Sequence, residues 1–175
     1  MREVTSAAKV QAFMKALGRD VSRPARIYFV GGSSAVIEGW RQSTVDVDLK
    51  IEAEQDAVFS CLPKIKEELH VNIELASPSD FIPELPGWRD RSVFIAREGP
   101  VDFFHYDFYS QALAKIERGH ALDLVDVGEM IRRGLVEPSA ALELFGRIEP
   151  ELHRFPAVDP ATFRRAVEAA FSKHA

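Results

Sequence analysis

Residues 27–51 read IYFVGGSSAVIEGWRQSTVDVDLKI, and this stretch combines three local patterns from which the fold class can be argued. Residues 27–30 are apolar and stop at a glycine pair, which is typical of a buried strand followed by a turn. The following segment, SSAVIEGW, predicts a short helix. From residue 43 to residue 52 apolar and polar residues alternate, which predicts a half-buried strand. These elements together indicate an α/β fold.

The flanking sequence extends this pattern in both directions. Residues 5–18 place four apolar side chains on one helical stripe, and Gly18 is predicted to end that helix. Residues 56–69 also predict a helix, which Pro63 should kink or split. The remaining expected elements are a strand at 71–77, a loop at 77–88, a hairpin formed by 92–98 and 101–109, and helices at 109–119, 122–134, 138–148 and 161–173.

The order of these elements predicts two parts of different character. Residues 1–109 are expected to form a mixed sheet flanked by helices, and residues 110–175 a helical C-terminal part. Because no linker-like composition separates the two parts, we expect them to pack as a single compact unit.

Composition excludes several classes of protein. The 175 residues contain 22 Lys and Arg against 27 Asp and Glu, a net charge of −5, which argues against an extended non-specific nucleic-acid surface. The sequence has no apolar run that is long enough to span a membrane. With a single cysteine and no apolar segment typical of a signal peptide near the start, we expect the chain to reside in the cytoplasm.

The glycine pair and the alternating strand carry residues suited to phosphate chemistry. Asp46 and Asp48 are two residues apart on a strand, so both project from one face, where a divalent cation would relieve their repulsion. Glycines at a strand-to-helix turn let a ligand approach the backbone, and a helix start favours phosphate. We call Asp46 and Asp48 the carboxylate pair. The glycine turn consists of Gly31, Gly32, Ser33 and Ser34.

Each of these features also has a plainer interpretation. A glycine pair often marks only a turn, and alternating acids are common on the solvated face of a strand. The turn lacks the Gly-Lys-Ser/Thr of a P-loop and does not follow the G-x-G-x-x-G dinucleotide pattern. It is the short spacing between the glycine turn and the carboxylate pair that favours a site.

The segment GGSSAVIEGWRQSTVDVDLKI resembles the signature of the DNA polymerase beta type nucleotidyltransferases. In that superfamily a Gly-Gly or Gly-Ser turn is followed, some ten or more residues later, by Asp-x-Asp on a strand. The resemblance implies a nucleotidyltransferase-like fold and a two-metal Mg²⁺ site on the carboxylate pair. It also implies a third carboxylate on a later strand, for which Glu74 in VNIELAS is the match and Asp102 the rival, although the family usually has Asp there.

A second segment, QALAKIERGHALDLVDVGEMI at 111–131, resembles the Lys-x-x-Arg and Asp-x-x-Asp region of AbiEii-type toxin nucleotidyltransferases and their small bacterial relatives. The resemblance implies that Lys115 contacts nucleotide phosphates and that a following aspartate helps to position it. The matching residues are Lys115, Arg118, Asp123 and Asp126. The alternative interpretation is a cluster of ion pairs at the protein surface.

These resemblances lead to a specific hypothesis and a rival. We expect Mg²⁺-dependent transfer of a nucleoside monophosphate from an NTP to an acceptor hydroxyl on RNA, protein or a small molecule. The rival is a protein that keeps the fold but only binds nucleotide, or that acts as a partner in a toxin–antitoxin pair. Among the other candidates, Arg41 could meet a phosphate but is expected to be solvated, and His105 belongs to no metal-ligand pattern.

Overall fold

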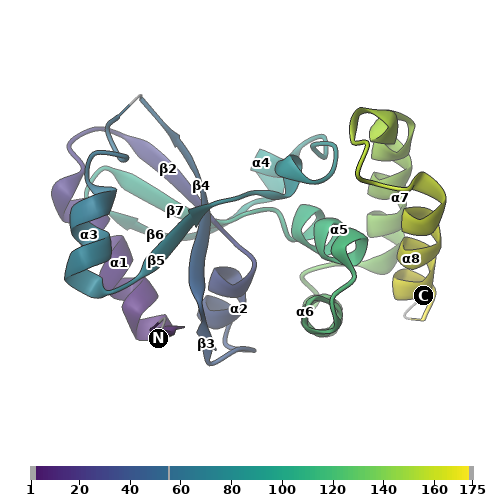
Figure 1. Ribbon diagram of the computed structural model, residues 1–175, viewed down its shortest axis with the longest axis horizontal. Coiled ribbons are helices and arrows are strands. Elements are labelled where there is room, and N and C mark those ends of the chain that lie inside the picture. Colours follow the sequence, from purple (N-terminus) through teal and green to yellow (C-terminus); the bar gives the residue numbers. More distant parts are fainter. Residues whose placement is uncertain (1–2, 55, 174–175) are drawn as a thin grey trace. The chain divides into compact units, whose positions relative to one another are not determined.

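The computed structural model describes residues 3–54 and 56–173, which divide into two units (Figure 1). The first unit contains the chain up to Ser77 together with Ser92–Tyr106. The second contains Pro78–Arg91 and the chain from Asp107 onward. The segment between the fifth and sixth strands therefore belongs with the C-terminal helices. The division after residue 109 and the packing of both parts as one unit stay predictions.

A five-stranded mixed sheet forms the centre of the first unit. The strand order is β5-β4-β2-β7-β6, with β2 antiparallel to β4 and parallel to β7, and with β5 parallel to β4. This mixed α/β architecture confirms the predicted fold class. The strands are β2 Ala25–Val30, β4 Asp46–Ala53, β5 Asn72–Leu75, β6 Val93–Glu98 and β7 Val101–His105.

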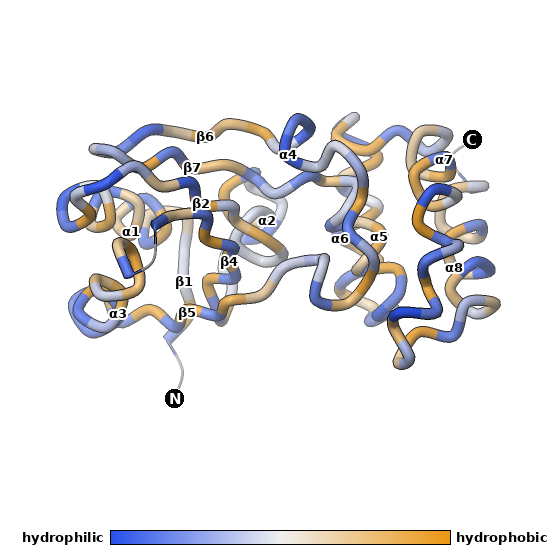
Figure 2. The backbone as a smooth tube through the Cα atoms, turned by 90° about the horizontal axis from the view of Figure 1, so that it is seen from above, coloured by the Kyte–Doolittle hydropathy of each residue, from blue (hydrophilic) through white to orange (hydrophobic). Residues whose placement is uncertain are grey.

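One face of this sheet forms the hydrophobic core. Along β4 its side chains alternate with polar ones, as the colours of this strand show in Figure 2. Helices α1 (Ala7–Asp20) and α3 (Leu62–Leu69) contribute apolar side chains to this core. The buried sheet residues include Ile27, Phe29, Val47, Leu49 and Phe103. The opposite face is left for the polar residues of β4 and β5.

Two helix boundaries differ from the sequence prediction. Gly18 does not end α1, which continues to Asp20; a β-carbon at Gly18 would collide with the backbone of Glu98, so the glycine allows the hairpin to approach the helix. Pro63 neither kinks nor interrupts α3. The proline lies in the first turn of the helix, where its missing N–H costs nothing, and residues 56–61 form turns instead.

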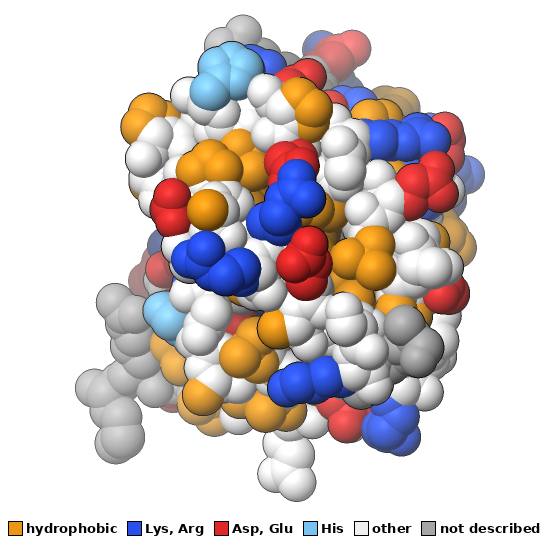
Figure 3. Space-filling model, turned by 90° about the vertical axis from the view of Figure 1, so that its right-hand side faces the viewer, with side chains coloured by type: hydrophobic (Ala, Val, Ile, Leu, Met, Phe, Trp, Pro, Cys, Tyr) orange, Lys and Arg blue, Asp and Glu red, His pale blue; other side chains and the backbone are white. Residues whose placement is uncertain are grey.

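The second unit is helical. Part of the predicted loop is ordered as a 3₁₀ helix, η1 (Pro78–Asp80), and a short helix, α4 (Trp88–Arg91), and Arg91 pairs with the buried Asp107 at 2.8 Å. Acidic and basic side chains are interspersed on the face shown in Figure 3. No helix in the described part of the chain is both long and apolar enough to cross a membrane. The other elements are α5 Phe108–Arg118, α6 Ala121–Arg132, α7 Pro138–Ile148, η2 Glu149–Arg154 and α8 Pro160–Ser172.

Candidate functional site

The glycine turn connects β2 to the short helix α2 (Gly32–Glu38). Gly31 has φ +61°, a conformation that favours glycine. Both serine side chains of the turn are buried. The Ser34 hydroxyl donates to the Phe29 carbonyl at 3.1 Å, and the Ser33 hydroxyl accepts from the backbone N–H of Asp48 at 3.1 Å. The serine side chains therefore fasten the turn to β2 and β4.

Parallel pairing of β4 with β5 sets polar residues of the two strands opposite one another. The register sets Asp46 opposite Asn72 and Asp48 opposite Glu74. The Asn72 amide donates a hydrogen bond to Oδ1 of Asp46. Oδ2 of Asp48 lies 3.2 Å from the point that a β-carbon on Gly31 would occupy. The structure thus brings the glycine turn and the carboxylate pair into direct proximity.

Asn72 is a polar residue of this site that sequence reasoning missed. It stands in VNIELAS two positions before Glu74, so both lie on the same face of β5. Asn72 was missed because the search for metal ligands considered only acidic residues. Its partner on β4, Asp46, follows from the parallel register of the two strands, which the sequence does not show. Its hydrogen bond fixes the orientation of one Asp46 oxygen.

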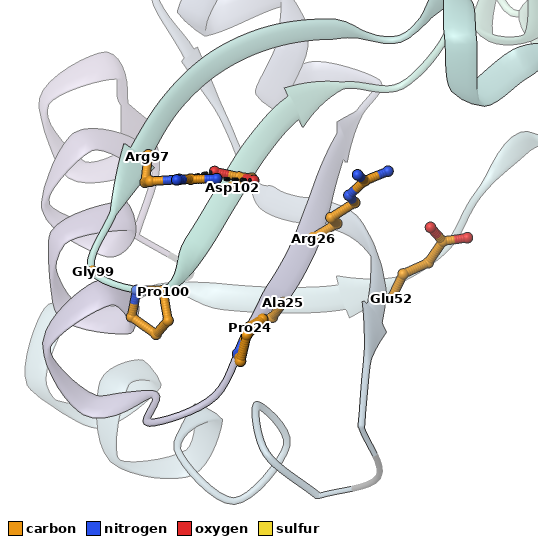
Figure 4. Close-up of a pocket in the computed structure, with 8 residues that line it drawn as sticks. All are labelled: Pro24, Ala25, Arg26, Glu52, Arg97, Gly99, Pro100 and Asp102. Atoms are coloured by element: carbon orange, nitrogen blue, oxygen red, sulfur yellow. Dashed lines mark hydrogen bonds and ion pairs between the residues drawn. The ribbon is translucent and has the colours of Figure 1, made fainter.

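The two candidates for a third carboxylate lie in different surroundings. Glu74 is exposed and lies in register beside Asp48. Asp102 lines a separate shallow pocket of about 460 Å³, where Arg97 donates to it at 2.6 and 2.9 Å and lowers its pKa (Figure 4). The sheet register aligns Asp102, through β2, with Glu52, four residues beyond Asp48 and so about 13 Å further along β4. This geometry favours Glu74.

The donor atoms at the carboxylate pair fit Mg²⁺, which prefers hard oxygen ligands and is commonly bound by one or two carboxylates together with substrate phosphates. Within residues 3–54 and 56–173, no three His, Cys, Asp or Glu side chains are grouped closely enough to hold a metal ion. The carboxylate pair can hold one Mg²⁺ without Glu74. A second metal site that includes Glu74 therefore stays a prediction.

A buried histidine connects β7 to α2 behind the glycine turn. Nδ1 of His105 lies 3.0 Å from Oγ of Ser34, and Nε2 lies 2.9 Å from a carboxylate oxygen of Glu38. Burial lowers the pKa of His105 to about 4, although the Glu38 carboxylate opposes this effect. His105 is consequently neutral near pH 7. Because Ser34 and His105 are 71 residues apart, this network had no local sequence signal.

The residues of the second resemblance form one cluster within the second unit. Nζ of Lys115 lies 3.2 Å from Asp123 and 2.7 Å from Asp126, and Arg118 donates twice to Asp123 at 2.6 Å. Burial by itself raises the pKa of Asp123, but the hydrogen bond from Arg118 and the charge of Lys115 outweigh burial and lower it. Lys115 and both aspartates are buried, so the alternative of a surface ion-pair cluster is wrong.

The sheet and the polar residues at the start of β4 and β5 define a protein with a nucleotidyltransferase-like α+β fold. A family model described as a nucleotidyltransferase of unknown function (DUF6036) matches residues 7–137, and the chain therefore belongs to this family. The match includes the glycine turn, the carboxylate pair, α5 and α6. It confirms the predicted nucleotidyltransferase class. Comparisons with curated proteins and with solved structures found no match.

Proposed function

We propose that the protein transfers a nucleoside monophosphate from an NTP to an acceptor hydroxyl and releases pyrophosphate. The observation that carries this proposal is the placement of the carboxylate pair against the glycine turn, with Asp48 joined to Ser33 by a hydrogen bond of 3.1 Å. A nucleotidyl transfer needs a cation site and a phosphate site side by side, and family membership supports this class of reaction.

In this proposal each group of the site has one task. Asp46 and Asp48 hold Mg²⁺, which when bound stabilises the charge that develops on the α-phosphate. Backbone N–H groups at Gly32 and Ser33 bind the β- and γ-phosphates. Glu74 extends the carboxylate pair toward the acceptor hydroxyl and completes a two-metal site. The Asn72 amide keeps the Asp46 carboxylate oriented in the absence of metal.

Lys115 and its cluster provide the second part of the proposal. The resemblance to AbiEii-type toxins supports a contact between Lys115 and the nucleotide phosphates, with Arg118, Asp123 and Asp126 orienting the ammonium. Calorimetric titration of a Lys115→Ala variant tests this contact. A lost phosphate contact weakens ATP binding and leaves AMP binding nearly unchanged, whereas equal effects on both nucleotides assign the cluster to the scaffold of the second unit.

One observation favours a second candidate function. Because no group of three carboxylate, imidazole or thiol side chains suited to a metal occurs in the described residues, a nucleotide-binding protein without turnover is the alternative. Such a protein could serve as one member of a toxin–antitoxin pair. Binding of NTP with no transfer of label under any condition would support this alternative.

The deciding experiment is a label-transfer assay. The purified protein is incubated with Mg²⁺, a cell extract and each α-³²P-labelled NTP in turn, and labelled macromolecules are separated by size and by nuclease or protease sensitivity. Wild type is expected to label one acceptor class, and Asp46→Asn to label none. Asp46→Asn should also keep or slightly raise the melting temperature without metal, because it removes repulsion within the carboxylate pair. A drop of several degrees would assign the pair a structural role.

A further inference from the structure

Arg41 places a guanidinium beside the glycine turn. Its Nη1 atom lies 3.4 Å from the point that a β-carbon on Gly32 would occupy, and the side chain is half-buried. On the neighbouring residue, Gly31, the corresponding point lies 3.2 Å from Oδ2 of Asp48. Two consecutive glycines therefore have a cation beside one and a carboxylate beside the other, all within the first unit.

The backbone around Arg41 is fixed by hydrogen bonds at the end of α2. The N–H groups of Gly39, Trp40 and Arg41 all point to the carbonyl of Ala35, at 3.0, 3.1 and 3.3 Å. This tight turn reverses the chain. It directs the residues after α2 back toward the start of the same helix, so Arg41 is held beside the glycine turn by the local fold.

A second anchor follows immediately in the sequence. Ser43 and Thr44 form β3, which pairs with β1 (Thr5–Ser6), and the register sets Thr44 opposite the fully buried Thr5. A β-carbon on Gly32 would collide with the Thr44 hydroxyl. Arg41 therefore lies between two fixed points of the backbone, which limits the positions that its guanidinium can reach.

We infer that Arg41 binds the polyphosphate of the substrate at the glycine turn, a role that rests on the proposed nucleotidyl transfer. A triphosphate placed between Gly31–Gly32 and the carboxylate pair brings several negative charges next to two aspartates. A bound Mg²⁺ offsets part of this charge. Arginine supplies a permanent positive charge and a planar set of donors that matches two phosphate oxygens at once. Arg41 thus supplies the phosphate cation of the first unit, independently of Lys115.

Calorimetry with pyrophosphate, ATP and AMP in the presence of Mg²⁺ tests this inference. Arg41→Ala is expected to weaken binding of ATP and pyrophosphate by about 10- to 100-fold, the loss typical of a hydrogen bond between charged groups. AMP binding should change less than about twofold, because AMP lacks the β- and γ-phosphates. Arg41→Lys should recover only part of the affinity, since an ammonium lacks the planar set of donors. Arg41→Gln replaces the alanine variant if the latter does not fold.

The matched control is Arg26→Ala, which removes an exposed arginine from β2 in the same unit, where it lies over the ring of Phe104 rather than at the glycine turn. If wild type binds ATP and Asp46→Asn loses the Mg²⁺-dependent part, but Arg41→Ala binds like Arg26→Ala, the inference about Arg41 alone is overturned. If wild type binds neither ATP nor pyrophosphate, the proposed function is overturned as well.

Discussion

Substitution of Lys115 by methionine tests whether the cluster between α5 and α6 behaves as a buried network. The change removes an ammonium that lies 3.2 Å from Asp123 and 2.7 Å from Asp126, among side chains that are 8, 3 and 0 % exposed. Methionine fills a similar volume, so the main effect is two buried carboxylates that lose their shared cation.

The structure sets the size of this effect. Breaking a buried ion pair by removing one partner costs about 3–5 kcal/mol, against about 0–1 kcal/mol for an exposed pair. For a chain of this size that loss corresponds to a decrease of roughly 6–20 °C in melting temperature. The double variant Lys115→Met/Asp126→Leu should recover part of the stability, because it removes a carboxylate together with its cation.

Tryptophan fluorescence allows the measurement to be confined to the second unit. The chain has two tryptophans, of which Trp88 is buried in the second unit and Trp40 belongs to the first. In a Trp40→Phe background, urea unfolding followed by fluorescence therefore reports the unit that contains Lys115. A Lys115→Met midpoint that implies less than about 1 kcal/mol of destabilisation would refute the reasoning that the two buried carboxylates depend on the Lys115 ammonium for stability.

Three further predictions concern the first unit. Gly32→Ala should lower the free energy of unfolding by about 1–3 kcal/mol, because its β-carbon collides with Thr44, and urea denaturation checks this loss. The pKa of His105 in the folded protein, about 4, lies below its ordinary value of 6.5, so the unfolded chain binds the proton at a higher pH than the folded protein does. The contribution of His105 to the free energy of unfolding should therefore be constant above pH 7. It should fall by about 3 kcal/mol as the pH drops from 6.5 to 4. A His105→Gln variant measured over the same pH range should lack this slope, and an equal slope in both proteins would contradict the assignment. Glu74→Gln should weaken binding of Mn²⁺, used as a substitute for Mg²⁺, whereas Asp102→Asn should not; the reverse result would make Asp102 the third ligand.

Local patterns predicted the elements that carry the site. The alternation from Asp46 onward depends only on neighbouring residues, because a half-buried strand exposes every second side chain, and the observed strand Asp46–Ala53 agrees with it. The glycine turn and the short helix after it were predictable for the same reason. The spacing between the turn and the carboxylate pair was enough to indicate that they belong together.

Features that depend on contacts distant in sequence were not predictable. Gly18 has the local appearance of a helix stop, but its role is set by the approach of Glu98, eighty residues later. The contact of His105 with Ser34 and the meeting of Asn72 with Asp46 likewise follow from strand order and register. The burial of Lys115 depends on how α5 and α6 pack, which a pattern of charges does not reveal. Pro63 is different, since the preference of proline for a first helical turn was available from the sequence.

The membership of Pro78–Arg91 in the second unit has a consequence for the synthesis of the protein. The ribosome delivers this segment before β6 and β7, yet Asp107, the partner of Arg91, is made only after both strands. The first unit can complete its sheet as soon as residue 106 emerges from the ribosome. At that point Pro78–Arg91 has no partner to pack against, because helices α5 to α8 of its unit have not yet emerged. A nascent chain arrested at the length at which residue 106 has just left the tunnel should therefore protect the sheet from protease and be cut within 78–91, and this vulnerability should disappear once α5 to α8 have also left the tunnel.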